Sequence, residues 1–425
     1  MDEAFLHHVW MFKRFNHHNL ILGNGKRLSI LNYGNHNRNS GPDFLNATLK
    51  IDHTIWHGHI EIHIRSKDWT AHKHNKDPAY NNVILHVVYE DNGPVTTESG
   101  IKPVCLELKG RIDMCLVSNY KGLFDRHLNI PCKNFISTID HTYINIYLER
   151  LLTERLQSKT RHILRVLKNV AGDWEQCLYV LILAYIGGPV NKVAFEELAN
   201  RVPYKLISKY LDKALSAEAL LFGQSGMLRR FEEDTYMKAL KKEYAHLKRK
   251  HRLLAMTGNE WRFGTLRPQN SPALRIAQIA AIYLKNKALL STILNAKTTK
   301  DLIAILDIET SRYWNRHFIP GKASSKKVKP FGMQTKTAIV INAFIPLLFA
   351  RGVLLNDEYL RILSIEFLAE LKAEDNHIIK MWTRLGIHVD NCSQTQALIE
   401  LKTQYCDKFK CLNCRLGTKL LLNAE

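Results

Sequence analysis

The sequence lacks the features that would place it among membrane, fibrous or secreted proteins. It has no internal repeat, no low-complexity segment and no apolar run of the roughly 20 residues that a bilayer-spanning helix needs. Its two most apolar stretches, 177–186 and 338–350, are shorter, and the second contains Asn342 and Pro346. The first residues also lack the basic and apolar regions of a signal peptide. We therefore expect a cytoplasmic protein that is not embedded in a membrane.

Acidic residues are scarce relative to basic ones. The 425 residues include 60 Lys and Arg but 40 Asp and Glu, which gives a formal net charge of +20. Such a charge is typical of proteins that bind polyanions, so nucleic acid is the expected partner, although a solvated lysine-rich surface has the same composition. An apolar content of 46% is sufficient for a large core and excludes a disordered chain.

Hydrophobic periodicity divides the chain into two parts. Apolar residues alternate in short runs between about residues 26 and 111, which predicts strands, after a short amphipathic helix over 3–15 that places Phe5, Val9 and Phe12 on one face. From about residue 142 they recur every three or four positions, which predicts helices. We therefore predict an α+β protein with a β-rich domain over 1–130, a helical domain over 131–390 and a C-terminal cysteine segment over 391–425.

The strand region concentrates ionisable side chains. Twelve of the 20 histidines lie in the first 86 residues. Because side chains alternate along a strand, Glu61, His63 and Arg65 should point to one side and the intervening isoleucines to the other. Asp43 enters the preceding strand, so Asp43 and Glu61 converge if the two strands pair. Two carboxylates can hold Mg²⁺ or Mn²⁺ for phosphodiester hydrolysis, while a third group orients water.

This layout resembles the PD-(D/E)xK nuclease superfamily. In that motif a Pro-Asp on one strand is followed on the next by an acidic residue, a spacer and a Lys, and here Pro42-Asp43 and Glu61-Ile62-His63 occupy those positions. The resemblance implies a restriction-endonuclease-like sheet, a nuclease activity and catalytic roles for Asp43, Glu61 and His63, with Glu3 as a further acid. His63 stands where the family has Lys, so either His63 replaces it, or Lys67 or Lys109 reaches the site, or the site has lost its activity.

Two other interpretations fit the same residues. The imidazoles could form a mononuclear Fe, Mn or Zn site inside a β-barrel, together with a carboxylate. The candidate ligands for that enzyme are His57, His59, Glu61, His72, His74 and His86. Alternatively, the histidine-rich sheet is the recognition face of a non-enzymatic module that binds nucleic acid or a protein partner.

Three cysteines stand close together near the end of the sequence. Cys406, Cys411 and Cys414 form a C-x4-C-x2-C pattern, which is typical of iron–sulfur or zinc ligation in a reducing compartment. A fourth ligand must come from elsewhere, and Cys132 is the preferred candidate, with Cys392 or a histidine as the alternative. Some nucleases of the PD-(D/E)xK type carry an iron–sulfur staple of three C-terminal cysteines and one distant cysteine, with a different spacing. Unpaired thiols are the remaining interpretation.

Basic residues cluster on one predicted helix, which we expect to hold phosphates. The candidate nucleic-acid-binding residues are Lys241, Lys242, Lys248, Arg249, Lys250, Arg252 and, further along, Arg267. The segments 40–44, 56–63, 68–69, 82–88, 267–268 and 406–414 together resemble an uncharacterised bacterial family, domain of unknown function 2851. This resemblance spans nearly the whole chain but implies no activity. Our leading hypothesis is therefore a metal-dependent, nuclease-like protein; the oligomeric state is not predicted.

Overall fold

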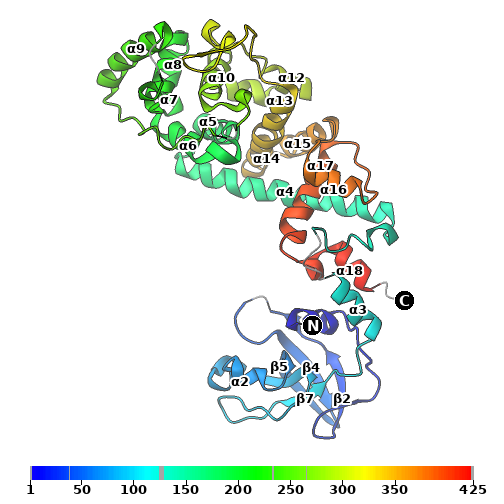
Figure 1. The fold of residues 1–425 in the computed structure, drawn as a ribbon. Coiled ribbons are helices and arrows are strands. Elements are labelled where there is room, and N and C mark those ends of the chain that lie inside the picture. The colour runs from blue at the N-terminus through cyan, green and yellow to red at the C-terminus, as the bar shows by residue number, and fades with distance from the viewer. Residues whose placement is uncertain (1, 38, 124–128, 232–233, 265, 423–425) are drawn as a thin grey trace. The chain divides into compact units, whose positions relative to one another are not determined.

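The computed structural model describes residues 2–37, 39–123, 129–231, 234–264 and 266–422 (Figure 1). Contacts divide the chain into two compact units. The first unit consists of Met1–Tyr147, Met381–Ile387 and Ile399–Glu425, and the second of Leu148–Lys380 and His388–Leu398. The C-terminal cysteine segment therefore folds with the N-terminal part of the chain.

The first unit is built on a mixed sheet of seven strands in the order β1-β2-β4-β5-β6-β7, with β3 paired to β4. Pairing is antiparallel from β1 to β5 and parallel between β5, β6 and β7. The strands are β1 (Leu20–Ile21), β2 (Arg27–Asn32), β3 (Asn35–His36), β4 (Phe44–Ile51), β5 (Thr54–Arg65), β6 (Val83–Glu90) and β7 (Val104–Glu107).

The apolar side of this sheet follows directly from alternation along the strands. Ile60 and Ile62 of β5 pair with Leu85 and Val87 of β6, and all four side chains are buried. The two strands approach closely at Gly58, where a Cβ atom would lie 2.5 Å from Ile84 Cγ2 and 2.6 Å from Asn82 O. Glycine at this position lets β6 come alongside β5 without a clash.

Three helices of the first unit precede, interrupt and follow the strands of the sheet along the chain. Helix α1 (Glu3–Met11) begins at Asp2, whose side chain accepts a hydrogen bond from Phe5 N, and it packs on β5 (Figure 1). Phe5 and Val9 are buried as predicted, whereas Phe12 lies just beyond the helix and is 40% exposed. Helix α2 (Asp68–Ala71) lies in the crossover from β5 to β6, and α3 (Met114–Leu123) follows β7. The C-terminal helix α18 (Arg415–Leu422) contacts α3.

The second unit is helical. Its first apolar helix, α5, begins after Asp173, whose side chain accepts from Gln176 N, and ends at Ile186 before the Gly187-Gly188 pair. Three helices continue from one unit into the other: α4 (His141–Asn169), α16 (His377–Thr383) and α17 (Cys392–Glu400). The remaining helices are α5 (Trp174–Ile186), α6 (Gly188–Arg201), α7 (Tyr204–Ile207), α8 (Ala214–Gln224), α9 (Thr235–His251), α10 (Pro272–Lys285), α11 (Leu289–Leu294), α12 (Thr299–Ala304), α13 (Met333–Ile339), α14 (Ile345–Leu354) and α15 (Glu358–Glu370), with a short hairpin of β8 (His317–Ile319) and β9 (Lys322–Ala323).

One helical run is longer than the apolar segment that the sequence suggested. Met333–Leu354 is continuous through α13, a π-helical turn and α14, and by length and apolar composition it could cross a bilayer. Two thirds of its most apolar window is buried within the structure, as in the core helix of a folded unit. Inside it, the Asn342 side chain accepts from Lys159 Nζ at 2.7 Å and donates to Tyr185 Oη at 3.0 Å.

The predicted fold class, an N-terminal helix and mixed sheet followed by a large helical region, is confirmed. The alternative of a β-barrel is wrong, because the sheet is open, with β1 and β7 at its two edges. Closure into a barrel would require those edge strands to pair.

A buried carboxyl group in the helical unit makes its stability depend on pH. Glu218 on α8 is 2% exposed and accepts a hydrogen bond from Tyr236 Oη at 2.9 Å. Burial raises the pKa of Glu218 to about 7, although the Tyr236 hydrogen bond opposes that shift. The folded state therefore holds this proton at pH values where the unfolded state has lost it, so stability falls as pH rises from about 4.5 to about 7.

Glu218→Gln removes this titration while keeping an oxygen that can accept from Tyr236. The free energy of unfolding of the variant, relative to the parent, should rise between pH 5 and pH 8 by on the order of 2 kcal/mol. Denaturant titrations of both proteins at the two pH values measure the difference. A difference that does not change with pH contradicts the assignment.

Candidate metal centre

The two carboxylates that the motif identifies meet where β4 begins. Asp43 immediately precedes β4, which pairs with β5 in the register Phe44 opposite Ile60. The Asp43 amide donates to Glu61 Oε2 at 3.1 Å, and the Ile62 amide donates to Asp43 Oδ2 at 2.9 Å. This reciprocal pair of bonds, the Asp43–Glu61 clamp, leaves the other oxygen of each carboxylate available to further groups.

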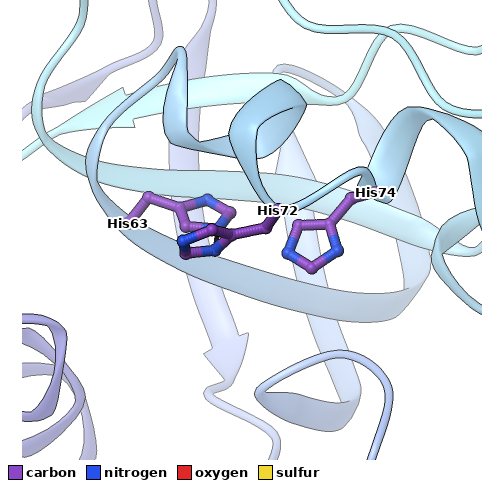
Figure 2. A group of neighbouring side chains, drawn as sticks. All are labelled: His63, His72 and His74. Carbon is purple, nitrogen blue, oxygen red and sulfur yellow. Dashed lines mark hydrogen bonds between the residues drawn. The ribbon is translucent and has the colours of Figure 1, made fainter.

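Three imidazoles gather next to Glu61. His63 lies two residues further along β5, and His72 and His74 follow α2 (Figure 2). The nitrogen atoms that these three offer all lie within 4.8 Å of one another. His63 and His74 are buried and His72 is exposed, so the group reaches solvent on the His72 side.

The carboxylate of Glu61 completes this group. Its Oε1 atom lies 3.1 Å from His74 Nε2 and 3.6 Å from His63 Nε2. The His74 nitrogen is buried, and its hydrogen bond to Glu61 opposes the burial that raises the pKa of that carboxyl group. A buried ring nitrogen beside a carboxylate is a suitable metal donor when it is unprotonated.

His63 is surrounded by other imidazoles. Its Nδ1 lies 2.8 Å from His86 Nε2 on β6, and its Nε2 lies 3.2 Å from His72 Nδ1. Burial is the main cause that lowers the pKa of His63 to about 2, and the neighbouring His86 and His74 lower it further. Burial likewise lowers the pKa of His86 to about 4. Both rings are therefore neutral at physiological pH, which is the form that binds metal.

Helix α1 brings a fourth imidazole, that of His7, and a third carboxylate, that of Glu3, to the clamp. His7 Nε2 lies 3.1 Å from Asp43 Oδ2. Burial alone would lower the pKa of His7, but its contact with Asp43 and the charges of Asp43 and Glu3 outweigh burial and raise it. Burial raises the pKa of Glu3, with the charge of Asp43 contributing, and that of Glu61. His7 thus keeps a proton to higher pH than an exposed histidine.

Aromatic rings cover the imidazoles on the α2 side. Tyr80 stacks on His74 with ring centroids 3.8 Å apart, and Trp69 packs edge-on against His63, His74 and His86. Trp69 is fully buried and its indole N–H donates to Thr96 O. These rings hold the histidine side chains in place and exclude water from one side of the group.

Some candidate residues lie away from this centre. Lys67 is exposed and its amide donates to Asn92, while Lys109 Nζ bonds to Glu90 at 2.7 Å, so the described structure does not bring either amine to Glu61. His57 contacts Thr48, and His59 Nδ1 accepts from Asn46 N. The expectation that Lys67 or Lys109 supplies the missing Lys is therefore not met by these contacts.

The structure adds His7, which the sequence reasoning did not single out. A signal was available, because Glu3 and His7 are four residues apart and so share one face of α1. The pairing of that face with Asp43 depends on how α1 packs on the sheet, which the spacing does not reveal.

The other candidate sites are also located. The basic residues of α9 run from its middle, where Lys242 is exposed and Lys241 half-buried, to its C-terminal end, where Arg249, Lys250 and Arg252 are exposed and Lys248 half-buried. Arg267 is exposed before a short turn. In the first unit, Cys132, Cys406, Cys411 and Cys414 line one pocket. Cys392 is elsewhere, with its Sγ 3.8 Å from Glu374 Oε2.

Comparison with known proteins identifies one family. The model of a protein family of unknown function (DUF2851) matches residues 3–377. No curated protein and no solved structure matches the chain.

Removal of single imidazoles tests whether this group binds metal. His74→Ala or His72→Ala should weaken Mn²⁺ binding by at least about tenfold, because each removes one nitrogen donor. Isothermal titration of the chelator-treated full chain with Mn²⁺ measures the effect; this ion is chosen because thiolates bind it poorly. His57→Ala is the control, because His57 lies on β5 like His63 but outside the group of three imidazoles. Equal affinity in all four proteins contradicts the site.

Proposed function

Because the chain belongs to a family of unknown function (DUF2851) whose description supplies no activity, we propose from the site itself that it is a metal-dependent phosphodiesterase of the nuclease type. One observation carries the proposal. Asp43 and Glu61, at the positions where the PD-(D/E)xK motif places its acidic residues, are joined in the Asp43–Glu61 clamp. Three imidazole nitrogens lie together beside Glu61 Oε1.

The donor set indicates which kind of ion would fit. Imidazole together with carboxylate suits Mn²⁺, Zn²⁺ or Fe²⁺ better than Mg²⁺, which prefers oxygen ligands alone. His63, His72, His74 and Glu61 would hold it, and Asp43 lies beside them. Of the two ions expected from the sequence, Mn²⁺ is therefore favoured over Mg²⁺.

His86 would support the ligand His63. When His63 Nδ1 carries the ring hydrogen and donates it to His86 Nε2, the lone pair of His63 Nε2 points toward His72 and Glu61. A partner that fixes the tautomer of a ligand histidine in this way is common at metal centres. Replacement of the motif's Lys by His63 would thus convert a cationic position into a ligand.

A bound divalent ion would stabilise the negative charge of a phosphoryl oxygen. It would also lower the pKa of a bound water molecule, so that hydroxide could form at neutral pH. The chain itself would supply proton transfer through His7. Asp43 lies 3.1 Å from His7 and raises its pKa, so His7 can hold a proton and give it to a leaving oxygen. His63 is unsuited to that role, because its lowered pKa keeps it unprotonated.

Charge supports a nucleic-acid substrate. The net charge of +20 is accompanied by exposed basic side chains at the end of α9, which would contact phosphates. The departure at His63, together with the positions of Lys67 and Lys109, favours a second candidate: a binding module that lacks cleavage and retains the metal for stability.

Glu61→Gln separates these two functions. It removes the charge of one ligand but keeps the size of the side chain, so cleavage of DNA or RNA in the presence of Mn²⁺ should fall at least about a hundredfold while nucleic-acid binding persists. The matched control is Glu98→Gln, an exposed position in the same unit. If the parent protein cleaves neither DNA nor RNA with Mn²⁺, Zn²⁺ or Fe²⁺, the nuclease proposal fails and the binding module is favoured.

The salt dependence of binding tests the role of α9. Each phosphate contact contributes about 0.9 to the slope of log affinity against log salt concentration. Alanine at Lys242, Arg249, Lys250 and Arg252 should therefore reduce the slope by up to about 3 to 4. Fluorescence anisotropy with a labelled duplex at several salt concentrations measures it, and Lys297→Ala with Lys300→Ala serves as the control. An unchanged slope means that α9 does not contact phosphates.

A further inference from the structure

Four of the eight cysteines surround one pocket of the first unit. Cys132 comes from the segment before α4, and Cys406 ends the π-helical turn Leu401–Cys406. Cys411 and Cys414 come from the turn that precedes α18. Each of the four side chains is buried to the same degree, with 7% of its surface exposed. Residues more than 270 positions apart in sequence thus present their thiols to a common space.

The fold around these thiols is close-packed. Gly417 on α18 faces the Cys411 carbonyl, and a Cβ atom there would lie 2.3 Å from that oxygen. The hydroxyl of Tyr147 donates to Cys414 Sγ at 3.8 Å. Trp382 and Tyr405 complete the lining of the pocket. Glycine at position 417 is therefore required for α18 to reach the cysteine turn.

We propose that Cys132, Cys406, Cys411 and Cys414 are the ligands of a thiolate-bound metal centre. A set of four cysteine sulfurs suits an iron–sulfur cluster and Zn²⁺ alike. The metal content of the purified chain separates these two occupants.

The metal centre would have a structural role that does not depend on the proposed nuclease activity. The turn Cys411–Asn413 packs against α1, the helix that carries Glu3 and His7. Tyr120 of α3 donates to Asp2 Oδ1 at 2.6 Å, and α3 in turn contacts α18. A centre that joins Cys132 to the C-terminal turn would fix the position at which α1 begins.

Elemental and spectroscopic analysis of the full chain, purified without oxygen, tests the proposal. We expect about four iron and four acid-labile sulfide per chain with visible absorption if the occupant is a cluster, or about one zinc per chain if it is a single ion. Single Ser variants at Cys132, Cys406, Cys411 or Cys414 should lose that metal. Cys115→Ser and Cys392→Ser should keep it, as should His74→Ala, which disrupts the other centre. Metal content that is unchanged in the four Ser variants would overturn the proposal.

A measurement on the unaltered protein guards against variants that fail to fold. Iodoacetamide should not label the four pocket cysteines of the native chain until the metal is removed by a chelator, whereas Cys115, which is exposed, should react at once. Mass spectrometry of the peptides reads the labelling. Protein without iron or zinc, or metal that persists in Cys132→Ser, would overturn the proposal.

Discussion

The reciprocal pair of hydrogen bonds between the start of β4 and the middle of β5 is the constraint on which the site depends. Asp43 and Glu61 each accept an amide from the opposite strand, so their carboxylates cannot separate without breaking the sheet. A slip of one residue in this register would turn Glu61 to the apolar side. Burial of Glu61 would cost several kcal/mol without partners, and the Asp43 amide and the nearby imidazoles offset that cost.

The two sides of the clamp divide the chemistry. On the β6 side, burial keeps His63 and His86 neutral, which suits metal ligation. On the α1 side, Asp43 and Glu3 raise the pKa of His7, which suits proton transfer. Histidines in one small region thus acquire opposite properties because one group is enclosed by aromatic rings and the other by carboxylates.

The first unit combines two donor sets of different softness. Nitrogen and oxygen donors lie beside the clamp, and sulfur donors lie at the pocket formed by α18 and Cys132. Ligand type would direct different metals to the two places, because thiolates favour iron–sulfur clusters or zinc and imidazole with carboxylate favours Mn²⁺ or Fe²⁺. Helix α1 links them physically, since it contributes His7 to one and packs on the cysteine turn of the other.

The sequence by itself determined the fold class, because periods of two and of three to four residues report burial in strands and helices before any tertiary contact is known. It also indicated the chain segments that carry chemistry: Asp43 and Glu61 on consecutive strands, the histidine-rich segment after them, and the C-terminal cysteines. Local spacing sufficed for these because each lies within one or two elements. Cys132 was a preference among separate thiols, and only the fold brings it to the pocket.

Tertiary structure decided which of many candidates meet. It gathered His72 and His74 with His63, because the chain reverses through α2, and left His57 and His59 on the outer part of the same strand. It added His7 through the packing of α1, and it directed Lys67 and Lys109 away from Glu61. It also kept the sheet open. These outcomes depend on contacts between elements that are distant in sequence, which periodicity and spacing do not encode.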